Sequence, residues 1–252
     1  MSGLVPAFSA ALGDAVWRAA ELGRASGATL ATGHAALDTQ LPGGGWPVGA
    51  ISEILQARGE HHEWRLLLPA LSRVANPAST PQSVVLVGAP QVPFGPGLTA
   101  QGLDAKRLLW VLASTPGERL WAAEQALHCA RVAAVLVWLP QVRSESLRRL
   151  QMSAQTHGKL LFVIRPLQAA AESSPAVLRV LASMRFDGDA LQLQILKRRG
   201  PPQDAPLSLL ARPARLAALL ASCAAQQRPD AWGVVRFFQE SGDALAGTAS
   251  AA

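Results

Sequence analysis

The sequence predicts an α/β fold with a mostly parallel central sheet flanked by helices. Short apolar runs rich in β-branched residues recur along the chain and are bounded by glycine, proline or polar residues, which is typical of buried parallel strands. Segments with apolar residues at helical spacing lie between these runs, so strands and helices alternate. Half of the 252 residues are hydrophobic and 16% are charged, which permits a large core and argues against global disorder.

The first elements follow from apolar spacing and proline. Residues 6–24 predict an amphipathic helix that packs either on its own core or on a neighbouring subunit. After a linker and a glycine-rich stretch, residues 51–55 predict a strand and residues 64–74 the first core helix. That helix should end before Asn76-Pro77, because proline cannot continue it. Residues 83–88 then predict a buried parallel strand.

The middle of the chain carries clear helix signals. Residues 102–111 predict a turn and a strand. Thr115-Pro116-Gly117-Glu118 predicts a helix start, with a hydroxyl cap, proline at the first helical position and glutamate three residues after the cap. Residues 133–139 predict another buried strand. We then expect Ser144 to cap a helix that closes at Gly158.

The sheet should end in an antiparallel hairpin at its edge. Residues 160–165 predict a strand, followed by a short loop from Gln168 to Pro175 and a further helical run. Residues 184–202 predict the hairpin, because the second arm alternates apolar and polar residues and Asp187-Gly188-Asp189 suits its tip.

Beyond Pro213 we expect an alanine-rich helix to about Gln226 and then an aromatic segment containing Trp232, Phe237 and Phe238. This aromatic segment is either a docking peptide for a partner or a last edge strand. The predicted regions are an N-terminal helix and linker (1–30), the core (31–210), a C-terminal helix and apolar segment (211–240) and a tail without core-forming residues (241–252).

The glycine-rich stretch carries a family resemblance. Leu37-Asp38, Gly43-Gly44-Gly45-Trp46-Pro47 and Ile51-Ser52-Glu53-Ile54 resemble the segment through which the RecA recombinase family enters its first core strand. The resemblance covers roughly residues 31–202 and implies a RecA-like core. In that family a phosphate-binding loop follows the strand at once.

The segment that follows here is a degenerate P-loop. A working loop of the form G-x-x-x-x-G-K-[ST] needs glycines whose N–H groups cradle phosphate, a lysine for charge and a hydroxyl for Mg²⁺. On the RecA pattern, Gln56 replaces the first glycine, His61 the second, His62 the lysine and Glu63 the Ser/Thr, and only Gly59 is a glycine.

Further ATPase residues are absent from the sequence. Glu60 and Glu63 would place negative charge where phosphates must sit. The strand at 83–88 leads into Ala89-Pro90 rather than a catalytic acid, and the strand at 133–139 ends in Trp138-Leu139 rather than the aspartate that holds the Mg²⁺ water shell. We therefore expect no tight ATP binding, no cofactor and no enzymatic activity.

The basic charge is concentrated in one stretch. The formal net charge is +6, from 23 basic and 17 acidic residues, and residues 140–200 hold ten Lys/Arg against four acids. This stretch suits nucleic acid or an acidic partner, but a solvated arginine-rich surface explains it equally well. The candidate contacts with a partner or DNA are Arg148, Arg149, Lys197, Arg198 and Arg199.

Several other classes of protein or site do not fit. No apolar run reaches the roughly 18 residues that cross a bilayer, and no basic region leads an apolar stretch at the N-terminus, so we expect a cytoplasmic protein without membrane contact. Cys129 and Cys223 fit a reduced compartment. A metal site at His61-His62 is not expected, because adjacent histidines diverge on a helix.

A closer resemblance suggests a function. Glu63-Trp64-Arg65-Leu66-Leu67-Leu68-Pro69-Ala70-Leu71, together with the preceding "LPGGGWP" segment, resembles the ImuA family of RecA-related, SulA-like accessory proteins of bacterial mutagenesis cassettes. The resemblance implies a non-catalytic role in SOS-induced translesion DNA synthesis. It also implies three partners: an inactive, ImuB-like Y-family polymerase homologue, an error-prone replicative-type polymerase, and RecA.

Two other functions stay open at this point. A SulA-type cell-division inhibitor that binds FtsZ is the leading alternative, although chains of that type are generally shorter. A genuine ATPase with an unusual loop is the third. Direct DNA binding and self-association are also left open by the sequence.

Overall fold

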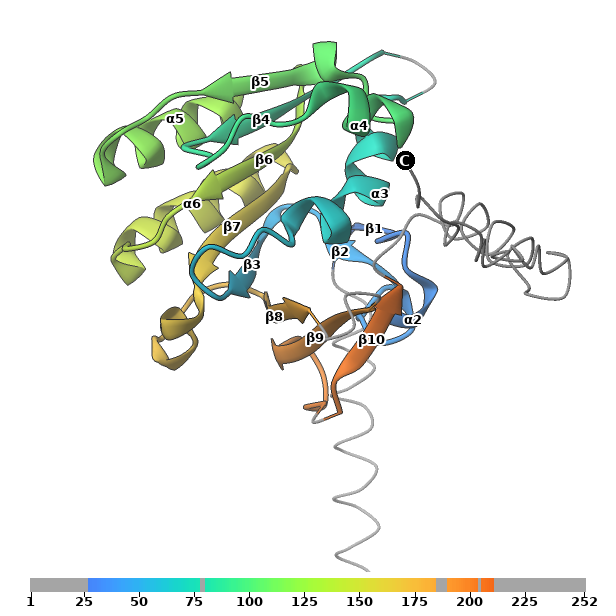
Figure 1. Cartoon of the computed structure of the whole chain (residues 1–252). Coiled ribbons are helices and arrows are strands. Elements are labelled where there is room, and N and C mark those ends of the chain that lie inside the picture. Colours follow the sequence, from blue (N-terminus) through green and yellow to red (C-terminus); the bar gives the residue numbers. More distant parts are fainter. Residues whose placement is uncertain (1–26, 78–79, 185–189, 204, 211–252) are drawn as a thin grey trace, which may run out of the picture. The chain divides into compact units, whose positions relative to one another are not determined.

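The computed structural model describes residues 27–77, 80–184, 190–203 and 205–210 (Figure 1). These described residues form an α/β fold with a mostly parallel eight-stranded sheet, helices on both of its faces, and a separate two-stranded antiparallel sheet. The predicted fold class is therefore confirmed, and the architecture is consistent with a RecA-like core.

The large sheet has the strand order β10-β9-β8-β3-β7-β6-β4-β5. The strands from β8 to β5 in this order run parallel, and β9 and β10 add antiparallel pairs at one end. β3 and β6 are buried along their whole length, because helices cover both faces of the sheet. The parallel strands are β3 (Ala50–Gln56), β4 (Ser83–Val87), β5 (Leu108–Val111), β6 (Val132–Trp138), β7 (Leu160–Pro166) and β8 (Leu178–Met184).

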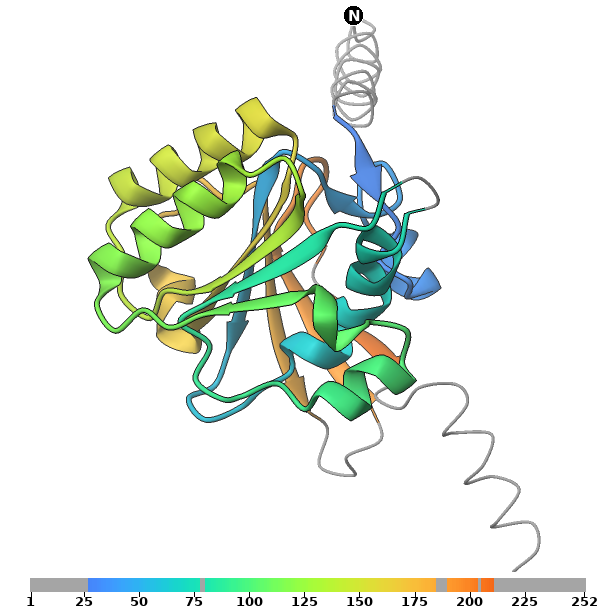
Figure 2. The same ribbon diagram turned by 90° about the horizontal axis from the view of Figure 1, so that it is seen from above.

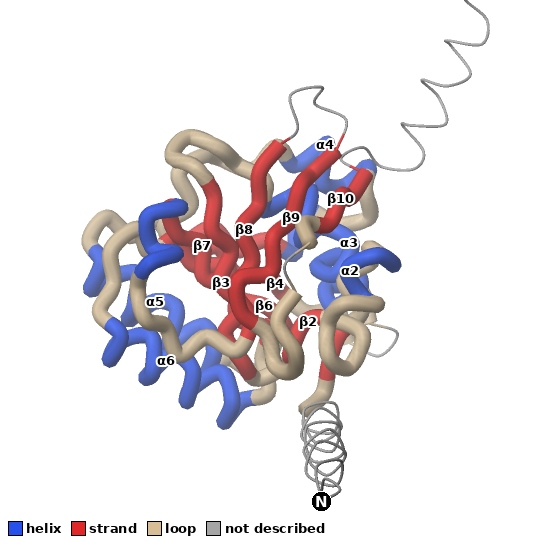
Figure 3. Tube along the Cα trace, turned by 90° about the horizontal axis from the view of Figure 1, so that it is seen from below, coloured by secondary structure: helices blue, strands red, loops and turns tan. Residues whose placement is uncertain are grey.

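Helices cover the two faces of the sheet unequally. α5 (Pro116–His128) and α6 (Ser144–His157) lie side by side on one face, and α3 (Glu63–Ala75) covers the other face together with the short helices α2 (Ala35–Asp38) and α4 (Gly95–Ala100) (Figures 2 and 3). Each face has its own apolar cluster, because alternate residues of one strand point to opposite sides. Ile54 belongs to the α3 cluster and Ile51 to the α5–α6 cluster.

α5 begins as the sequence predicts. The Thr115 hydroxyl accepts from the Glu118 N–H at 3.2 Å, and the Glu118 carboxylate accepts in return from the N–H groups of Thr115 and Ser114. These backbone bonds, that of Thr115 first, hold the pKa of Glu118 below its ordinary value. The capping box therefore fixes the position of α5 beside the carboxyl end of β5.

The start of α6 differs from the prediction by one residue. Arg143 is the N-cap, with extended backbone, and its carbonyl oxygen accepts from the Leu147 N–H, so Ser144 is already the first helical residue. Ser144 makes no capping bond for this reason. The predicted end is confirmed, because Gly158 takes the left-handed conformation with φ of 58° that closes many helices.

The glycine run Gly43-Gly44-Gly45 lets two chain segments approach closely. β1 (Thr29–Leu30) pairs with β2 (Trp46–Pro47), and a Cβ on Gly45 would lie 2.1 Å from the Leu30 carbonyl oxygen. Any larger residue would therefore separate the two strands. Trp46 is fully buried and meets the Phe162 ring edge-on at 5.3 Å, which anchors this segment to the sheet.

At the antiparallel end of the sheet the structure differs from two predictions. The helical run expected after Pro175 is strand β8, and β8 is also the first arm of the hairpin, which pairs with β9 (Ala190–Lys197). β9 is not the edge either, because β10 (Leu207–Leu210) pairs along it. β8 lacks alternation, since four of its seven residues are buried and three of these are consecutive, so apolar spacing could not reveal it.

Two 3₁₀ turns complete the described chain. η1 (Ala105–Arg107) leads into β5, and η2 (Leu167–Ala171) forms the short connection that we expected between β7 and the next element. None of the helices in the described part of the chain has both the length and the apolar character needed to cross a membrane.

Several predictions fall on residues that the structure does not describe. They are the helix at 6–24, the hairpin tip Asp187-Gly188-Asp189, the helix at 213–226, the aromatic residues Trp232, Phe237 and Phe238, and the tail at 241–252. The four predicted regions and their boundaries stay predictions.

Candidate functional site

A cleft of about 930 Å³ lies at the carboxyl ends of the parallel strands. Segments that follow β3, β4, β5, β6 and β7 all contribute to its walls, together with η2. In open α/β sheets this edge is where ligands bind, because the connections after neighbouring strands diverge there. The degenerate P-loop reaches the same cleft through Gln56, Gly59 and His61.

Side chains of the degenerate P-loop bond to one another. The Gln56 amide nitrogen donates to the Glu63 carboxylate at 3.0 Å, and the Gln56 amide oxygen accepts from the His62 N–H at 3.0 Å. Gln56 and Glu63 are 5% and 2% exposed. The residue at the place of the first glycine therefore ties the loop to the start of α3.

This bonding uses backbone donors that a phosphate would need. The N–H of Glu60 bonds to the Ala57 carbonyl oxygen and the N–H of His62 to Gln56, so neither is free to cradle an anion. The Glu63 carboxylate is buried at the N-terminus of α3, where a phosphate would otherwise benefit from the helix dipole. The Glu63 carboxylate therefore lies at the helix N-terminus where a bound phosphate would otherwise lie.

The two histidines turn to different carboxylates. His62 Nε2 lies 2.9 Å from Glu60, and His61 Nδ1 lies 3.5 Å from Glu63. Across the described residues, no group of three or more His, Cys, Asp or Glu side chains is placed to hold a metal ion. The two imidazoles thus contact different carboxylates, and both residues precede α3, which begins at Glu63.

An arginine occupies the ends of β5 and β6. Arg119 donates from Nε to the Ala113 carbonyl oxygen and from Nη1 to the Trp138 carbonyl oxygen, both at 3.0 Å. Gly88, with φ of 65°, permits this arrangement because a Cβ there would lie 2.5 Å from Arg119 Nε. A guanidinium thus lies beside the strand end where a magnesium-binding ATPase presents an aspartate.

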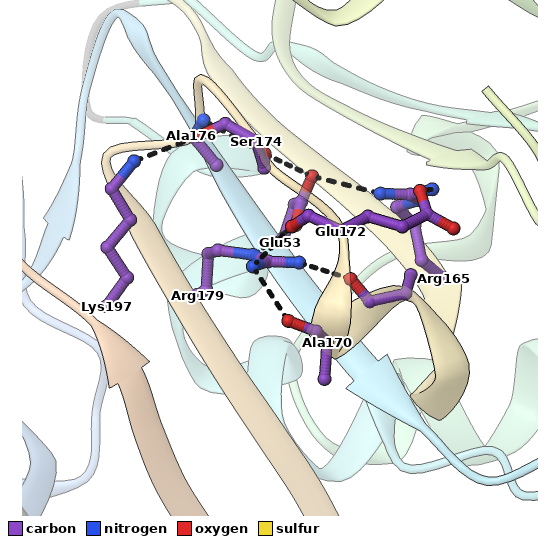
Figure 4. Close-up of polar contacts among 9 residues, drawn as sticks. Glu53, Arg165, Ala170, Glu172, Ser174, Ala176, Arg179 and Lys197 are labelled. Carbon is purple, nitrogen blue, oxygen red and sulfur yellow. Dashed lines mark hydrogen bonds and ion pairs between the residues drawn. The ribbon is translucent and has the colours of Figure 1, made fainter. Parts of the chain in front are cut away.

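A buried ion cluster lies beneath the η2 side of the cleft (Figure 4). Glu53, fully buried in β3, accepts from Arg179 Nε and from the Ser174 hydroxyl at 2.6 Å each, and lies 3.6 Å from Arg165 Nη1. Arg165 Nη2 in turn contacts Glu172 at 2.6 Å. A buried carboxylate needs such partners, because burial without them is very costly.

The same cluster fixes the connection between β7 and β8. Arg179 donates to the carbonyl oxygens of Ala169, Ala170 and Glu172, and so holds the end of η2 against the sheet (Figure 4). Lys197 Nζ donates to the Ser174 carbonyl oxygen at 2.9 Å. The wall of the cleft is therefore a bonded structure and not a loose loop.

The five basic residues predicted as partner contacts do not form one site. Arg149 bridges α6 to α5 through Glu124 at 2.8 Å, while Arg148 is exposed on α6. Arg198 and Arg199 line a different pocket of about 430 Å³ beside β1 and β2. Arg198 also donates to the carbonyl oxygens of Gln40 and Pro201, so its side chain links these two segments of the chain.

Three arginines that line the cleft were missed by the sequence analysis: Arg58, Arg119 and Arg165. Arg165 gives a usable signal, because a charged residue inside an otherwise apolar strand must find a buried partner. The same signal marks Glu53 and Arg179. Arg58 and Arg119 give no such signal, since exposed or half-buried arginines in loops and helices are ordinary.

Comparisons with known proteins add no identification. No model of a known protein family matches the chain, and no curated protein sequence matches it either.

Proposed function

We propose that this chain is a non-catalytic, RecA-like accessory protein of SOS-induced translesion DNA synthesis, working in the cytoplasm. Its core acts as a docking module for an inactive Y-family polymerase homologue and an error-prone replicative-type polymerase, and it binds RecA. The partners come from the resemblance to the ImuA family, carried by the "LPGGGWP" segment and by residues 63–71.

The observation that carries the proposal is the self-bonded P-loop. Gln56, Glu63 and the His62 N–H satisfy one another in a buried position, so the segment has a stable structure that does not depend on nucleotide. A phosphate group would have to break these bonds and approach a buried carboxylate, both of which oppose binding. A RecA-like core with a P-loop closed by its own side chains is suited to protein contacts.

A pull-down from DNA-damaged cells tests the proposal. Tagged full-length chain should recover polymerase components after damage and far less without damage. Recovery of FtsZ in place of polymerase components would favour the SulA-type inhibitor and contradict the proposal. Arg148→Glu is suitable as a variant bait, because it alters only an exposed side chain. Gln56→Leu is unsuitable, because it removes buried bonds of the core.

A further inference from the structure

We propose that the cleft at the carboxyl ends of the strands binds an acidic peptide segment of a partner protein. The peptide's carboxylate would lie on Arg58, Arg119 and Arg165, and a neighbouring apolar side chain on the cleft wall. The inference rests on the proposed function, since it names the docking surface and the chemistry of the segment that docks there.

The first argument is the charge of the cleft. Its lining holds three arginines and two glutamates, and both glutamates already have partners: Glu60 contacts His62 and Glu172 contacts Arg165. Arg58 is exposed and has no ion pair within the described residues. Arg119 bonds only to neutral carbonyl oxygens there. Unneutralised positive charge in a concave site attracts an anionic ligand.

The second argument is the set of buried donors without acceptors. Arg165 is 2% exposed, yet its Nε and Nη1 have no hydrogen-bond partner in the described structure, and neither has Nε1 of buried Trp138. Both residues line the cleft. Buried donors are usually satisfied in folded proteins, so these two residues leave unused hydrogen-bonding capacity in the cleft wall, as Trp46, Trp110 and Ser153 do elsewhere in the described structure.

The third argument is the position of Glu172. Its side chain is 55% exposed, but its carboxylate reaches in to Arg165 Nη2 at 2.6 Å. A surface carboxylate therefore already occupies one side of a buried guanidinium. We infer that Glu172 takes, in the free protein, the place that a partner's Asp or Glu takes in the complex.

The walls favour a peptide over a nucleotide. Pro90, Pro140 and Pro166 stand at the ends of the strands and have no N–H to offer to a phosphate. Leu112 is 76% exposed beside them, which is unusual for a large apolar side chain at a cavity. Proline and leucine surfaces suit apolar side chains of an extended segment.

The test uses random dodecapeptides displayed on phage and selected against the full-length chain. We expect the enriched peptides to carry Asp or Glu next to a large apolar residue. Fluorescein-labelled copies are then titrated by fluorescence polarisation against variants. Arg58→Glu should weaken binding by about tenfold or more through charge reversal, and Glu172→Gln should tighten it because the internal competitor is gone.

A matched control is available on the opposite edge of the sheet. Arg131 is exposed before the amino end of β6, so Arg131→Glu makes the same charge change away from the cleft and should leave peptide binding unchanged. The inference is overturned if the enriched peptides lack acidic residues, if Arg58→Glu and Arg131→Glu weaken binding equally, or if a magnesium–ATP analogue displaces the peptides.

The outcomes also separate this inference from the proposed function. If Arg58→Glu protein recovers polymerase components from damaged cells as well as the unaltered chain does, the docking role stands and the cleft is the wrong surface. If acidic peptides bind the cleft but the chain recovers FtsZ, the cleft assignment stands and the translesion role is wrong.

Discussion

Replacing Gln56 by leucine should destabilise the core strongly. The change keeps most of the side-chain volume but removes two buried bonds, one to the Glu63 carboxylate and one from the His62 N–H. A hydrogen bond to a charged group contributes about 1.5–3 kcal/mol, and a buried N–H left unpaired costs about 1–3 kcal/mol. We therefore expect the free energy of unfolding to fall by about 3–5 kcal/mol, a large part of an ordinary total of about 5–15 kcal/mol.

Urea unfolding followed by far-ultraviolet circular dichroism measures this loss. The double variant Gln56→Leu/Glu63→Leu should recover at least half of it, because replacing a buried polar pair by apolar residues is often neutral. Gln125→Leu, on the exposed face of α5, serves as the matched control and should stay within about 0.5 kcal/mol of the unaltered chain. A loss under about 1 kcal/mol for Gln56→Leu, or no recovery in the double variant, would refute the self-bonded loop.

Three further predictions test other parts of the structure. Arg179→Met should lower the free energy of unfolding by about 3–5 kcal/mol, because it leaves the Glu53 carboxylate buried with a single distant cation; urea unfolding measures this, and an unchanged midpoint would contradict the cluster. Thr115→Ala should cost about 1 kcal/mol through loss of the cap of α5, and a thermal midpoint equal to that of the unaltered chain would count against the cap. Burial lowers the pKa of His34 against the weaker effects of the Leu66 carbonyl oxygen and Asp38, so the unfolded chain binds the proton more tightly. Stability should therefore fall as the pH drops below about 6.5 and level off below the folded-state pKa, and His34→Gln should reduce this dependence in thermal unfolding between pH 7 and 5.

Local signals predicted much of the fold because they act within a few residues. The sequence Thr115-Pro116-Gly117-Glu118 predicts the helix start that the structure shows, since both bonds of the capping box span three residues. The buried strands around 83–88 and 133–139 were equally clear, because helices on both faces require continuous apolar runs.

Elements that depend on distant pairing were missed. Leu178–Met184 contains a charged residue and an alanine in a mostly buried run, so it resembles a helix until its neighbours β3 and β9 are known. β10 is four residues long after a proline-rich turn, and its pairing with β9 alone defines it. Sequence periodicity carries no information about such long-range contacts.

The sequence likewise predicts one part of the candidate site and not the other. The sequence predicts what the P-loop has lost, because the required residue types are read directly from Gln56, His61, His62 and Glu63. It does not predict that Gln56 bonds Glu63 within the core. Nor does it predict that Arg58, Arg119 and Arg165 meet at one cleft, since strand order brings them together.

Titration of the purified full-length chain with a fluorescent ATP analogue in the presence of Mg²⁺ tests the central claim most directly. A core whose P-loop is filled by its own side chains should give no saturable signal up to about 1 mM nucleotide, the upper end of the KM range typical of enzymes. Saturable binding with magnesium-dependent turnover, both lost in a His62→Ala variant, would contradict the claim.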